Sequence, residues 1–308
     1  MTTLIAEQMA AVESVLNSAV QTDVELLEEA SRHIIGSGGK RIRPQLLFLA
    51  YLAAGGQAPE SVVGMAAAVE LVHTATLVHD DINDHSPTRR GRVAVHARWG
   101  RTFALLTGDY LFTKVYELMA PYGDVYNVAM ADACVRLVEG ETLQAQAAKT
   151  GEIDQETYKR IILRKTASLF ETSASMGAMM AGADEQTVSA LADYGRHLGL
   201  AFQIVDDILD VTGDPETLGK PVGSDIVQGA GALMASNGRK HGSATAVAEH
   251  DPIRALMERL RESGAVEVAM SQADEMARRA HTALTRLPNT QARAELETLV
   301  NLVVERQN

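Results

Sequence analysis

The feature that most constrains the fold of this chain is a long stretch without proline. Ninety-three residues separate Pro121 from Pro215, and proline is the residue that most strongly interrupts an α-helix. Within the stretch, apolar residues recur at intervals of three and four, as in Val125, Val128 and Ala129, which is the period of a helix with one buried face. No run of alternating apolar and polar residues is long enough to predict a strand. The sequence therefore predicts long helices.

The composition supports a chain built almost wholly from helices. Aromatic residues make up only 4% of the 308 residues, whereas the helix formers Ala, Leu and Met are plentiful. No linker rich in Gly, Ser or Pro divides the chain, and no internal repeat is present. We therefore expect a large all-α assembly of about ten helices, in one domain over residues 1–308. Loops are expected near residues 36–43, 55–60, 85–93, 121–124, 150–154, 182–186, 212–229 and 237–252.

Charge and hydropathy exclude several function classes. The 28 basic and 40 acidic residues give a formal net charge of −12, which argues against general binding to nucleic acid or to an anionic membrane. The longest purely apolar run, Leu46–Ala54, has nine residues, whereas a membrane-spanning helix needs about 20. The single cysteine, Cys134, excludes a disulfide framework. Because the N-terminus also lacks the features of a signal peptide, we expect a soluble, cytoplasmic protein with no integral membrane segment.

Two clusters of three aspartates are the strongest chemical signal. Both have the spacing Asp-Asp-x-x-Asp and follow apolar helices, which are expected over Val62–Val78 and from near Val188. Residues three and four apart share a helix face, so each cluster brings like charges together unless a cation lies between them. Mg²⁺ prefers one or two carboxylates together with waters and phosphate oxygens. The candidate metal ligands are Asp80, Asp81, Asp84, Asp206, Asp207 and Asp210.

Alternative roles for these residues fit the pattern less well. One cluster alone could be a solvated acidic face or a helix cap, but two copies are hard to attribute to chance. A calcium-binding loop starting at Asp81 lacks the required glycine and glutamate. Glu70-x-x-His73 matches half of a di-iron site, yet no second Glu-x-x-His exists. His79-Asp80 resembles the dyad of helical metal phosphohydrolases, which would leave the second aspartate cluster without a role.

Basic residues occur close to the first cluster in sequence. The run Gly38–Pro44 (GGKRIRP) places three cations in a glycine-containing loop, and Arg89, Arg90 and Arg92 follow Asp84. In an acidic chain, such residues predict a site where Mg²⁺ and arginines together hold a polyphosphate. Charge balance between neighbours is the simpler alternative.

In combination, these motifs resemble the trans-isoprenyl (polyprenyl) diphosphate synthases, which extend prenyl chains head to tail. The similarity covers about 190 residues and runs through motifs in the family's order: GGKRIRP, VELVHTATLVHDDINDHSPTRRG, GDYL at 108–111, GETLQ at 140–144, RKTASLF at 164–170, FQIVDDILD and GKPVGSD. A lone Asp-Asp-x-x-Asp would be a weak signal, but the ordered set is highly specific. The resemblance implies an all-α fold, a single large helical bundle of the isoprenoid synthase type with about ten or more helices around a central cavity. It also implies a member of the long-chain type.

The resemblance also implies a role for each candidate residue. The two aspartate clusters would bind Mg²⁺ on the allylic diphosphate from two sides, and Arg89 would bind the same diphosphate. Four residues would bind isopentenyl diphosphate, namely Lys40, Arg43, His73 and Arg90. Three would line the site of the allylic cation, namely Lys165, Thr166 and Gln203. Lys165 and Lys220 would also reach the allylic diphosphate.

The implied reaction proceeds by ionisation, condensation and elimination. Mg²⁺ and the cationic side chains would stabilise the charge that develops on the leaving diphosphate. The released pyrophosphate would take the proton from C2, and the apolar helix bundle would keep water away from the cation. The resemblance further implies a homodimer.

Product length in this family depends on the residues beneath the first cluster. Ala75 and Thr76 stand five and four positions before Asp80, which places them roughly 6–8 Å deeper along the helix. Bulky aromatic residues there would stop a growing tail, whereas Ala and Thr would not. We therefore expect a product of C30 or longer, with geranylgeranyl diphosphate (C20) as the alternative.

One departure from the family pattern follows Asp225. The family usually continues with Gly-Lys, but Ala230 stands at the position of that lysine here. The change bears on catalytic efficiency or product length more than on the class of reaction. A regulatory subunit of a heteromeric synthase is disfavoured because all six aspartates are present. A terpene cyclase is disfavoured because it would need neither GGKRIRP nor a second complete cluster.

Overall fold

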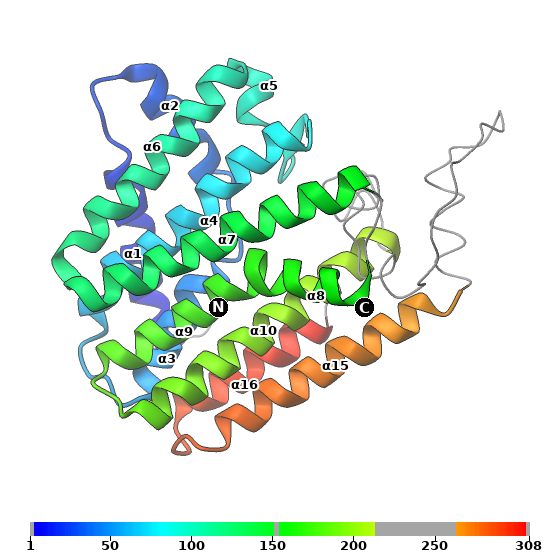
Figure 1. The fold of residues 1–308 in the computed structure, drawn as a ribbon. Helices are drawn as coiled ribbons and strands as arrows, with labels where there is room; N and C mark the ends of the chain where they lie inside the picture. Colours follow the sequence, from blue (N-terminus) through cyan, green and yellow to red (C-terminus); the bar gives the residue numbers. More distant parts are fainter. Residues whose placement is uncertain (1–2, 151–153, 213–262, 306–308) are drawn as a thin grey trace. The chain divides into compact units, whose positions relative to one another are not determined.

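A computed structural model describes residues 3–150, 154–212 and 263–305 of the chain (Figure 1). These residues are helical almost throughout, and the prediction of an all-α fold is confirmed. The α-helices are α1 (Ala6–Ala19), α2 (Glu25–Ile35), α3 (Ile42–Ala53), α4 (Val63–Asn83), α5 (Val95–Trp99), α6 (Arg101–Met119), α7 (Asp124–Thr150), α8 (Gln155–Ile162), α9 (Ser168–Met180), α10 (Glu185–Thr212), α15 (Ala265–Leu284) and α16 (Gln291–Val304). The shorter elements are the 3₁₀ helices η1 (Thr3–Ile5), η2 (Pro59–Val62) and η3 (Ala120–Tyr122), the π-helical turn η4 (Leu163–Ala167), and the strands β1 (Thr88–Arg89) and β2 (Arg92–Val93).

The contacts within the chain divide it into two compact units. The first comprises Met1–Cys134, Thr172–Ala192 and Arg286–Leu296, and the second comprises Val135–Glu171, Asp193–Thr285 and Glu297–Asn308. Helix α4 belongs to the first unit and helix α10 belongs mostly to the second. The single domain expected from the sequence remains a prediction.

Helix α4 forms the core of the first unit and packs antiparallel to α6 (Figure 1). Near its start, the backbone N–H of Met65 donates to the Tyr122 hydroxyl at 3.1 Å, and near its end the His79 ring lies 3.4 Å from the Leu105 carbonyl. Residues 59–83 are long and apolar enough to cross a membrane by length and composition, but 67% of their apolar window is buried inside the molecule. The expectation based on Leu46–Ala54 overlooked this helix because Glu70 interrupts its apolar run. Such burial is typical of a core helix.

The core of the second unit joins three helices that are distant in sequence. Tyr158 and Ile162 of α8 pack with Ile204, Val205 and Ile208 of α10 and with an alanine face of α15. Small alanines spaced four apart let α15 approach closely, and burial of apolar area stabilises the contact by about 25 cal/mol per Å². This packing fixes α8 against the part of α10 that carries the second aspartate cluster.

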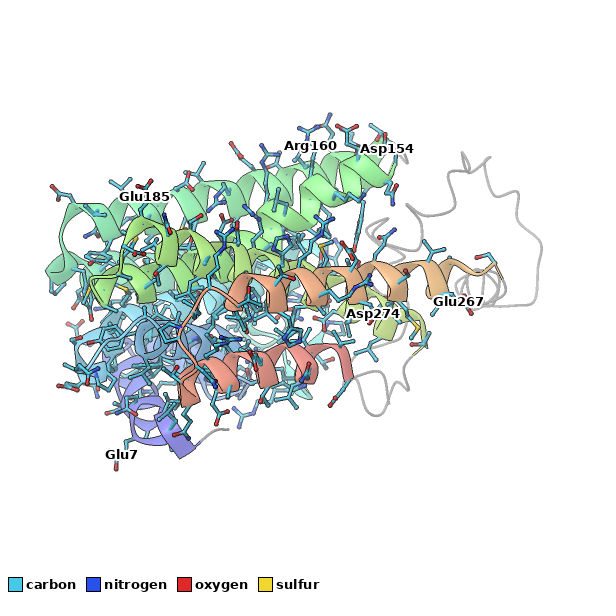
Figure 2. The ribbon with its side chains drawn as sticks, turned by 90° about the horizontal axis from the view of Figure 1, so that it is seen from below. Glu7, Asp154, Arg160, Glu185, Glu267 and Asp274 are labelled. Atoms are coloured by element: carbon cyan, nitrogen blue, oxygen red, sulfur yellow. The ribbon has the colours of Figure 1, made fainter. Side chains whose placement is uncertain are left out.

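The helix ends are stabilised by local charge. Acidic side chains occupy the first turns of α1, α10 and α15 at Glu7, Glu185 and Glu267 (Figure 2), where they interact favourably with the helix dipole. At the start of α8, the Asp154 carboxylate accepts a hydrogen bond from the Thr157 N–H at 2.7 Å. This hydrogen bond lowers the pKa of Asp154 and marks an N-cap.

Three local features go beyond the expectations from the sequence. Helix α4 extends past Val78 to Asn83 and includes Asp80 and Asp81, so the first aspartate cluster ends this helix. The segment 85–93 is not a plain loop but contains the β1–β2 hairpin. Within the long proline-free stretch, α8 and α9 are separated by η4, a wider turn that apolar periodicity alone does not reveal.

Candidate active site

The first aspartate cluster lies at the C-terminal end of α4. Asp80 and Asp81 belong to its last turn, and Asp84 follows the helix end with its N–H donating to the Asp80 carbonyl at 2.8 Å. Asp80 and Asp84 are partly exposed, whereas Asp81 is 1% exposed. The first cluster thus contains one buried carboxylate, Asp81, and two accessible ones, Asp80 and Asp84.

Asp81 is held by Arg89 from the hairpin. The Arg89 Nε donates to Asp81 Oδ1 at 2.7 Å, and the Nη2 of the same guanidinium contacts the same oxygen. Burial raises the pKa of Asp81, although the Arg89 hydrogen bond opposes the shift. The second carboxylate oxygen, Oδ2, is buried and accepts no hydrogen bond from the described residues. A buried carboxylate oxygen without a donor is a suitable ligand for a cation.

The β1–β2 hairpin positions the arginines near this cluster. Thr88 pairs with Val93 and Arg89 pairs with Arg92, so Arg90 and Gly91 form the two-residue turn. Both have positive φ angles, 51° and 73°, as a type I′ hairpin turn requires. The turn directs Arg89 to Asp81, while Arg90 donates to the Gly38 carbonyl.

The GGKRIRP loop meets the hairpin through its glycines. Gly39 has φ 140°, and a Cβ there would lie 2.7 Å from Nη1 of Arg90, so a side chain at this position would displace the guanidinium. Lys40 is exposed, whereas Arg43 is buried in the first turn of α3. The glycine backbone of the loop therefore lies against Arg90.

His73 lies on α4 among these arginines and is mostly buried. Its pKa is lowered well below the ordinary value, first by loss of hydration and then by the charges of Arg43, Arg90, Arg89 and Arg41. His73 is therefore neutral at physiological pH and offers a ring nitrogen for hydrogen bonding rather than a charge.

The alternative metal sites considered from the sequence do not fit this environment. Glu70 is paired with Arg41 at 2.9 Å rather than directed towards a metal. The ring of His79 stacks on Phe112 and lies 3.5 Å from the Asp109 carboxylate. Across residues 3–150, 154–212 and 263–305, no three His, Cys, Asp or Glu side chains converge to hold a metal ion by themselves. A metal here would need ligands from a bound phosphate, as Mg²⁺ commonly has.

The second aspartate cluster lies in the last turns of α10, in the second unit. Asp207 and Asp210 are 3% and 1% exposed, and Asp206 is partly exposed. Asp207 accepts two hydrogen bonds, from the Tyr158 hydroxyl to Oδ2 at 2.6 Å and from Gln203 Nε2 to Oδ1 at 2.9 Å. Both clusters thus have a second aspartate held by protein donors and a first aspartate that is accessible.

A hydrogen-bond chain connects this cluster to the π-helical turn η4. The Thr166 hydroxyl donates to Gln203 Oε1 at 2.6 Å, and Gln203 in turn donates to Asp207. Lys165 forms an ion pair with Glu141 of α7 at 2.8 Å. The structure therefore brings Thr166 and Gln203 into contact, two of the three residues that the resemblance assigns to the site of the allylic cation, whereas the side chain of the third, Lys165, pairs with Glu141.

Two glycines allow neighbouring helices to reach the π-helical turn. A Cβ at Gly140 of α7 would collide with the backbone of Lys165, and a Cβ at Gly199 of α10 would lie 2.7 Å from the Cα of Ala167. Because π-turns are rare and occur mostly at functional sites, this packing indicates that the unusual turn is held in place. Tyr158, Glu141 and Gly140 were not singled out from the sequence as site residues. Among the motifs that carry the resemblance, GETLQ contains Gly140 and Glu141, so the sequence held a signal for these two residues but none for Tyr158.

The remaining candidate residues are placed as follows. Ala75 is fully buried on α4, and Thr76 is partly buried with its hydroxyl donating to the His73 carbonyl at 2.8 Å. Lys220 and Ala230 lie outside the described residues.

Comparison with known proteins gives a consistent result. The family model for polyprenyl synthetase matches residues 24–287. The chain is 40% identical to a short chain isoprenyl diphosphate synthase of Methanothermobacter thermautotrophicus, over 92% of this chain and 91% of that protein. It is 35% identical to the octaprenyl diphosphate synthase of Escherichia coli, over 98% and 97%.

Solved structures agree with the sequence relatives. A polyprenyl synthase from Caulobacter crescentus, crystallised with calcium and isoprenyl diphosphate, superposes with a TM-score of 0.91 at 35% identity, covering 99% of this chain and 96% of that one. The heptaprenyl diphosphate synthase from Staphylococcus aureus gives a TM-score of 0.92 at 31% identity, covering 99% of both chains. With its all-α isoprenoid synthase fold and its match over most of the sequence, the chain belongs to the polyprenyl synthetase family and is a prenyltransferase.

Proposed function

We propose that this prenyltransferase condenses isopentenyl diphosphate head to tail with an allylic diphosphate, in the presence of Mg²⁺, to give a polyprenyl diphosphate of C30 or longer. The observation that carries the proposal is the geometry around Asp81. A buried carboxylate oxygen that accepts no hydrogen bond within the described part of the chain lies next to Arg89, and Arg90 of the same hairpin contacts the glycine loop. A carboxylate oxygen that can bind Mg²⁺, together with arginines that can bind phosphate, suits a metal-bound diphosphate better than either kind of group does alone.

The residues present fit a divalent metal through their chemistry. The accessible aspartates, Asp80, Asp84 and Asp206, offer hard oxygen ligands, and Asp81 offers its buried Oδ2. Asp207 is held by Tyr158 and Gln203. Asp210 completes the second cluster. Bound Mg²⁺ supplies positive charge that stabilises the leaving diphosphate as the allylic C–O bond ionises.

The chain's own residues then bind and orient the two substrates. Arg89 contacts the allylic diphosphate, and Lys220, outside the described residues, is assigned to it by resemblance. Isopentenyl diphosphate is held by four residues, Lys40, Arg43, His73 and Arg90. The neutral His73 donates a hydrogen bond to a phosphate oxygen without adding to the repulsion among the arginines.

The π-helical turn serves the allylic carbon. The Thr166 hydroxyl oxygen, the Gln203 carboxamide oxygen and the Lys165 carbonyl present partial negative charge to the developing cation. The isopentenyl double bond then attacks C1, and the released pyrophosphate accepts the proton lost from C2. Apolar helices around the site exclude the water that would quench the cation.

Product length is the finer part of the proposal. Small residues at Ala75 and Thr76 favour a tail longer than C20, and one relative is named for a long product, octaprenyl diphosphate. A geranylgeranyl product is the second candidate, because two archaeal relatives are named geranylgeranyl diphosphate synthase. They are 38% and 39% identical to this chain in alignments that cover about 70% of their own length. A regulatory subunit is disfavoured by the complete aspartate clusters.

The assay uses purified protein with Mg²⁺, isopentenyl diphosphate and farnesyl diphosphate, and mass spectrometry reads the product length. Products of C30 or longer are expected. A stop at C20 would keep the reaction and refute the long-chain assignment. Absence of product with geranyl, farnesyl and geranylgeranyl primers would refute the catalytic assignment and favour a subunit role.

A cytoplasmic homodimer is part of the proposal. Helix α7 exposes Val125, Val128, Val135 and Val138 to between 57% and 67% of their surface, and their spacing of three and seven places them along one helix face. An apolar row of this kind is typical of an interface with a second copy. Sedimentation equilibrium should give twice the 33.1 kDa chain mass.

A further inference from the structure

Arg41 stands between Lys40 and Arg43 in the GGKRIRP loop, but its side chain is directed into the protein. It is 6% exposed. Its guanidinium donates to Glu70 Oε1 at 2.9 Å, to Glu13 Oε1 at 2.7 Å and to the Ile35 carbonyl at 2.9 Å. Burial opposes the charge, but Glu13 and Glu70 outweigh it and raise the pKa of Arg41. Arg41 is thus a charged anchor joining the loop to α1, α2 and α4.

The backbone of Arg41 is held in an unfavourable conformation. Its φ angle is 48°, in the left-handed region, which a non-glycine residue adopts only when its surroundings fix it. The conformation ends the loop, because the next residue, Ile42, starts α3. Gln45 of that helix donates to the Lys40 carbonyl at 2.6 Å. The direction of Lys40 and the start of the helix carrying Arg43 therefore both depend on how Arg41 is held.

A buried ion pair of this kind is not explained by stability. Replacing both partners with neutral groups of similar volume often leaves stability unchanged or increases it, because two charges must lose their hydration. Arg41 and Glu70 are 5% and 2% exposed at their side chains. Their presence needs another reason, and the neighbouring loop supplies one. Preorganising a phosphate-binding loop lowers the cost of ordering it when ligand binds.

We infer that Arg41 is a positioning residue for isopentenyl diphosphate: its ion pairs with Glu70 and Glu13 hold the loop so that Lys40 and Arg43 meet the diphosphate without rearrangement. The inference rests on the proposed function of this loop. It separates Arg41, which touches no substrate, from its two basic neighbours.

The test replaces the ion pair with neutral side chains in the double variant Arg41→Met/Glu70→Gln. The KM for isopentenyl diphosphate should rise about tenfold, while kcat, the KM for farnesyl diphosphate and the melting temperature change little. Arg41→Lys keeps the positive charge and one ion pair, so its KM for isopentenyl diphosphate should rise less than that of the double variant. Glu13→Gln, at a half-exposed partner, should give a smaller rise and remains informative if the double variant fails to fold.

The matched control is Arg32→Met/Glu28→Gln, the same change at an exposed pair on α2. Its KM for isopentenyl diphosphate should equal that of the wild type. If the wild type condenses its substrates and all Arg41 and Glu13 variants keep the wild-type KM, the inference is overturned and the proposed function stands. A parallel fall in kcat and melting temperature without a KM change would assign Arg41 a purely structural role. If the wild type neither condenses nor binds isopentenyl diphosphate by calorimetry, the proposed function fails and the inference fails with it.

Discussion

At the scale of single residues, the two members of each Asp-Asp pair differ in their surroundings. Asp80 and Asp206 are accessible, whereas Asp81 and Asp207 are buried and held by protein donors. The same sequence motif therefore contains accessible carboxylates and buried ones that are held by protein donors. Substitution at the two kinds of position should have different consequences for stability.

The first prediction compares Asp80→Ala with Asp207→Ala. Both should lower kcat by about 10²–10³-fold, the loss typical of removing one preorganised electrostatic group. Asp80→Ala should change the free energy of unfolding by about 0.5 kcal/mol or less. Asp207→Ala leaves the hydroxyl of Tyr158 and the amide of Gln203 without their acceptor, which should cost about 1–3 kcal/mol. Turnover assays and urea denaturation measure the two effects, and near-normal condensation by Asp80→Ala would remove the metal assignment.

The second prediction concerns pH and His73. Its folded-state pKa lies well below the unfolded value of about 6.5, so the unfolded chain binds more protons as the pH falls below that value. The His73 contribution to stability is therefore complete above about pH 6.5 and decreases at lower pH, by about 1.4 kcal/mol for each unit of difference in pKa. Thermal melts of wild type and His73→Gln between pH 7.5 and 5 should converge as the pH falls. If the melting temperatures of the two proteins instead change in parallel with pH, His73 is not the group whose protonation lowers stability.

At the scale of secondary-structure elements, η4 depends on the helices packed around it. A π-turn is an uncommon local structure, and here Gly140 of α7 and Gly199 of α10 both lie against its backbone. The turn presents Thr166 to Gln203, so its position and the hydrogen-bond chain to Asp207 are coupled.

The third prediction is that Gly140→Ala displaces the π-turn. The added methyl group would collide with the Lys165 backbone, which should cost about 1–3 kcal/mol of stability and lower kcat about tenfold or more. Gly177→Ala is the matched control, because its Cβ would collide with the Leu47 carbonyl at another helix contact. The control should lose stability with little change in kcat. Equal kcat values for the two variants would contradict the role of the turn.

The fourth prediction tests the link between α8 and α10. Tyr158→Phe removes one hydroxyl and leaves Asp207 Oδ2 without that donor, so we expect activity to fall about 10–100-fold, as is typical of groups that orient metal-site residues. Tyr51→Phe is the control, since it removes a buried hydroxyl that accepts from the Ala58 N–H at 3.0 Å in the first unit. Steady-state assays at several Mg²⁺ concentrations should show a higher Mg²⁺ requirement for Tyr158→Phe alone.

At the scale of the whole molecule, the proposed long product requires room for a tail that extends past α4. Ala75 is fully buried, whereas Thr76 is partly exposed. An aromatic side chain at Thr76 therefore has more room than one at Ala75, where overpacking would cost about 1–3 kcal/mol.

The fifth prediction is that Thr76→Phe shortens the product while condensation continues. Ala75→Phe should also shorten it, with an additional loss of stability. Thr76→Val serves as the control, since it keeps the size of the side chain and removes only the hydroxyl bonded to the His73 carbonyl. Mass spectrometry measures the product length of each variant. An unchanged length for both phenylalanine variants would mean that residues of another helix limit the length of the product.

The sequence by itself determined the helical class, the family and most candidate residues. Helical periodicity is local, and ordered motifs such as GGKRIRP and the two aspartate clusters are visible without coordinates. Tertiary structure alone decided which aspartates are buried, that Arg90 and Gly91 turn a hairpin, that η4 interrupts a helix, and that Arg41 and Tyr158 donate to carboxylates within the core. The carboxylate contacts of Arg41 and Tyr158 join residues 28 to 49 positions apart, and the burial of the aspartates depends on helix packing. Spacing along one helix specifies a face, but which groups meet that face is determined only when distant segments pack together.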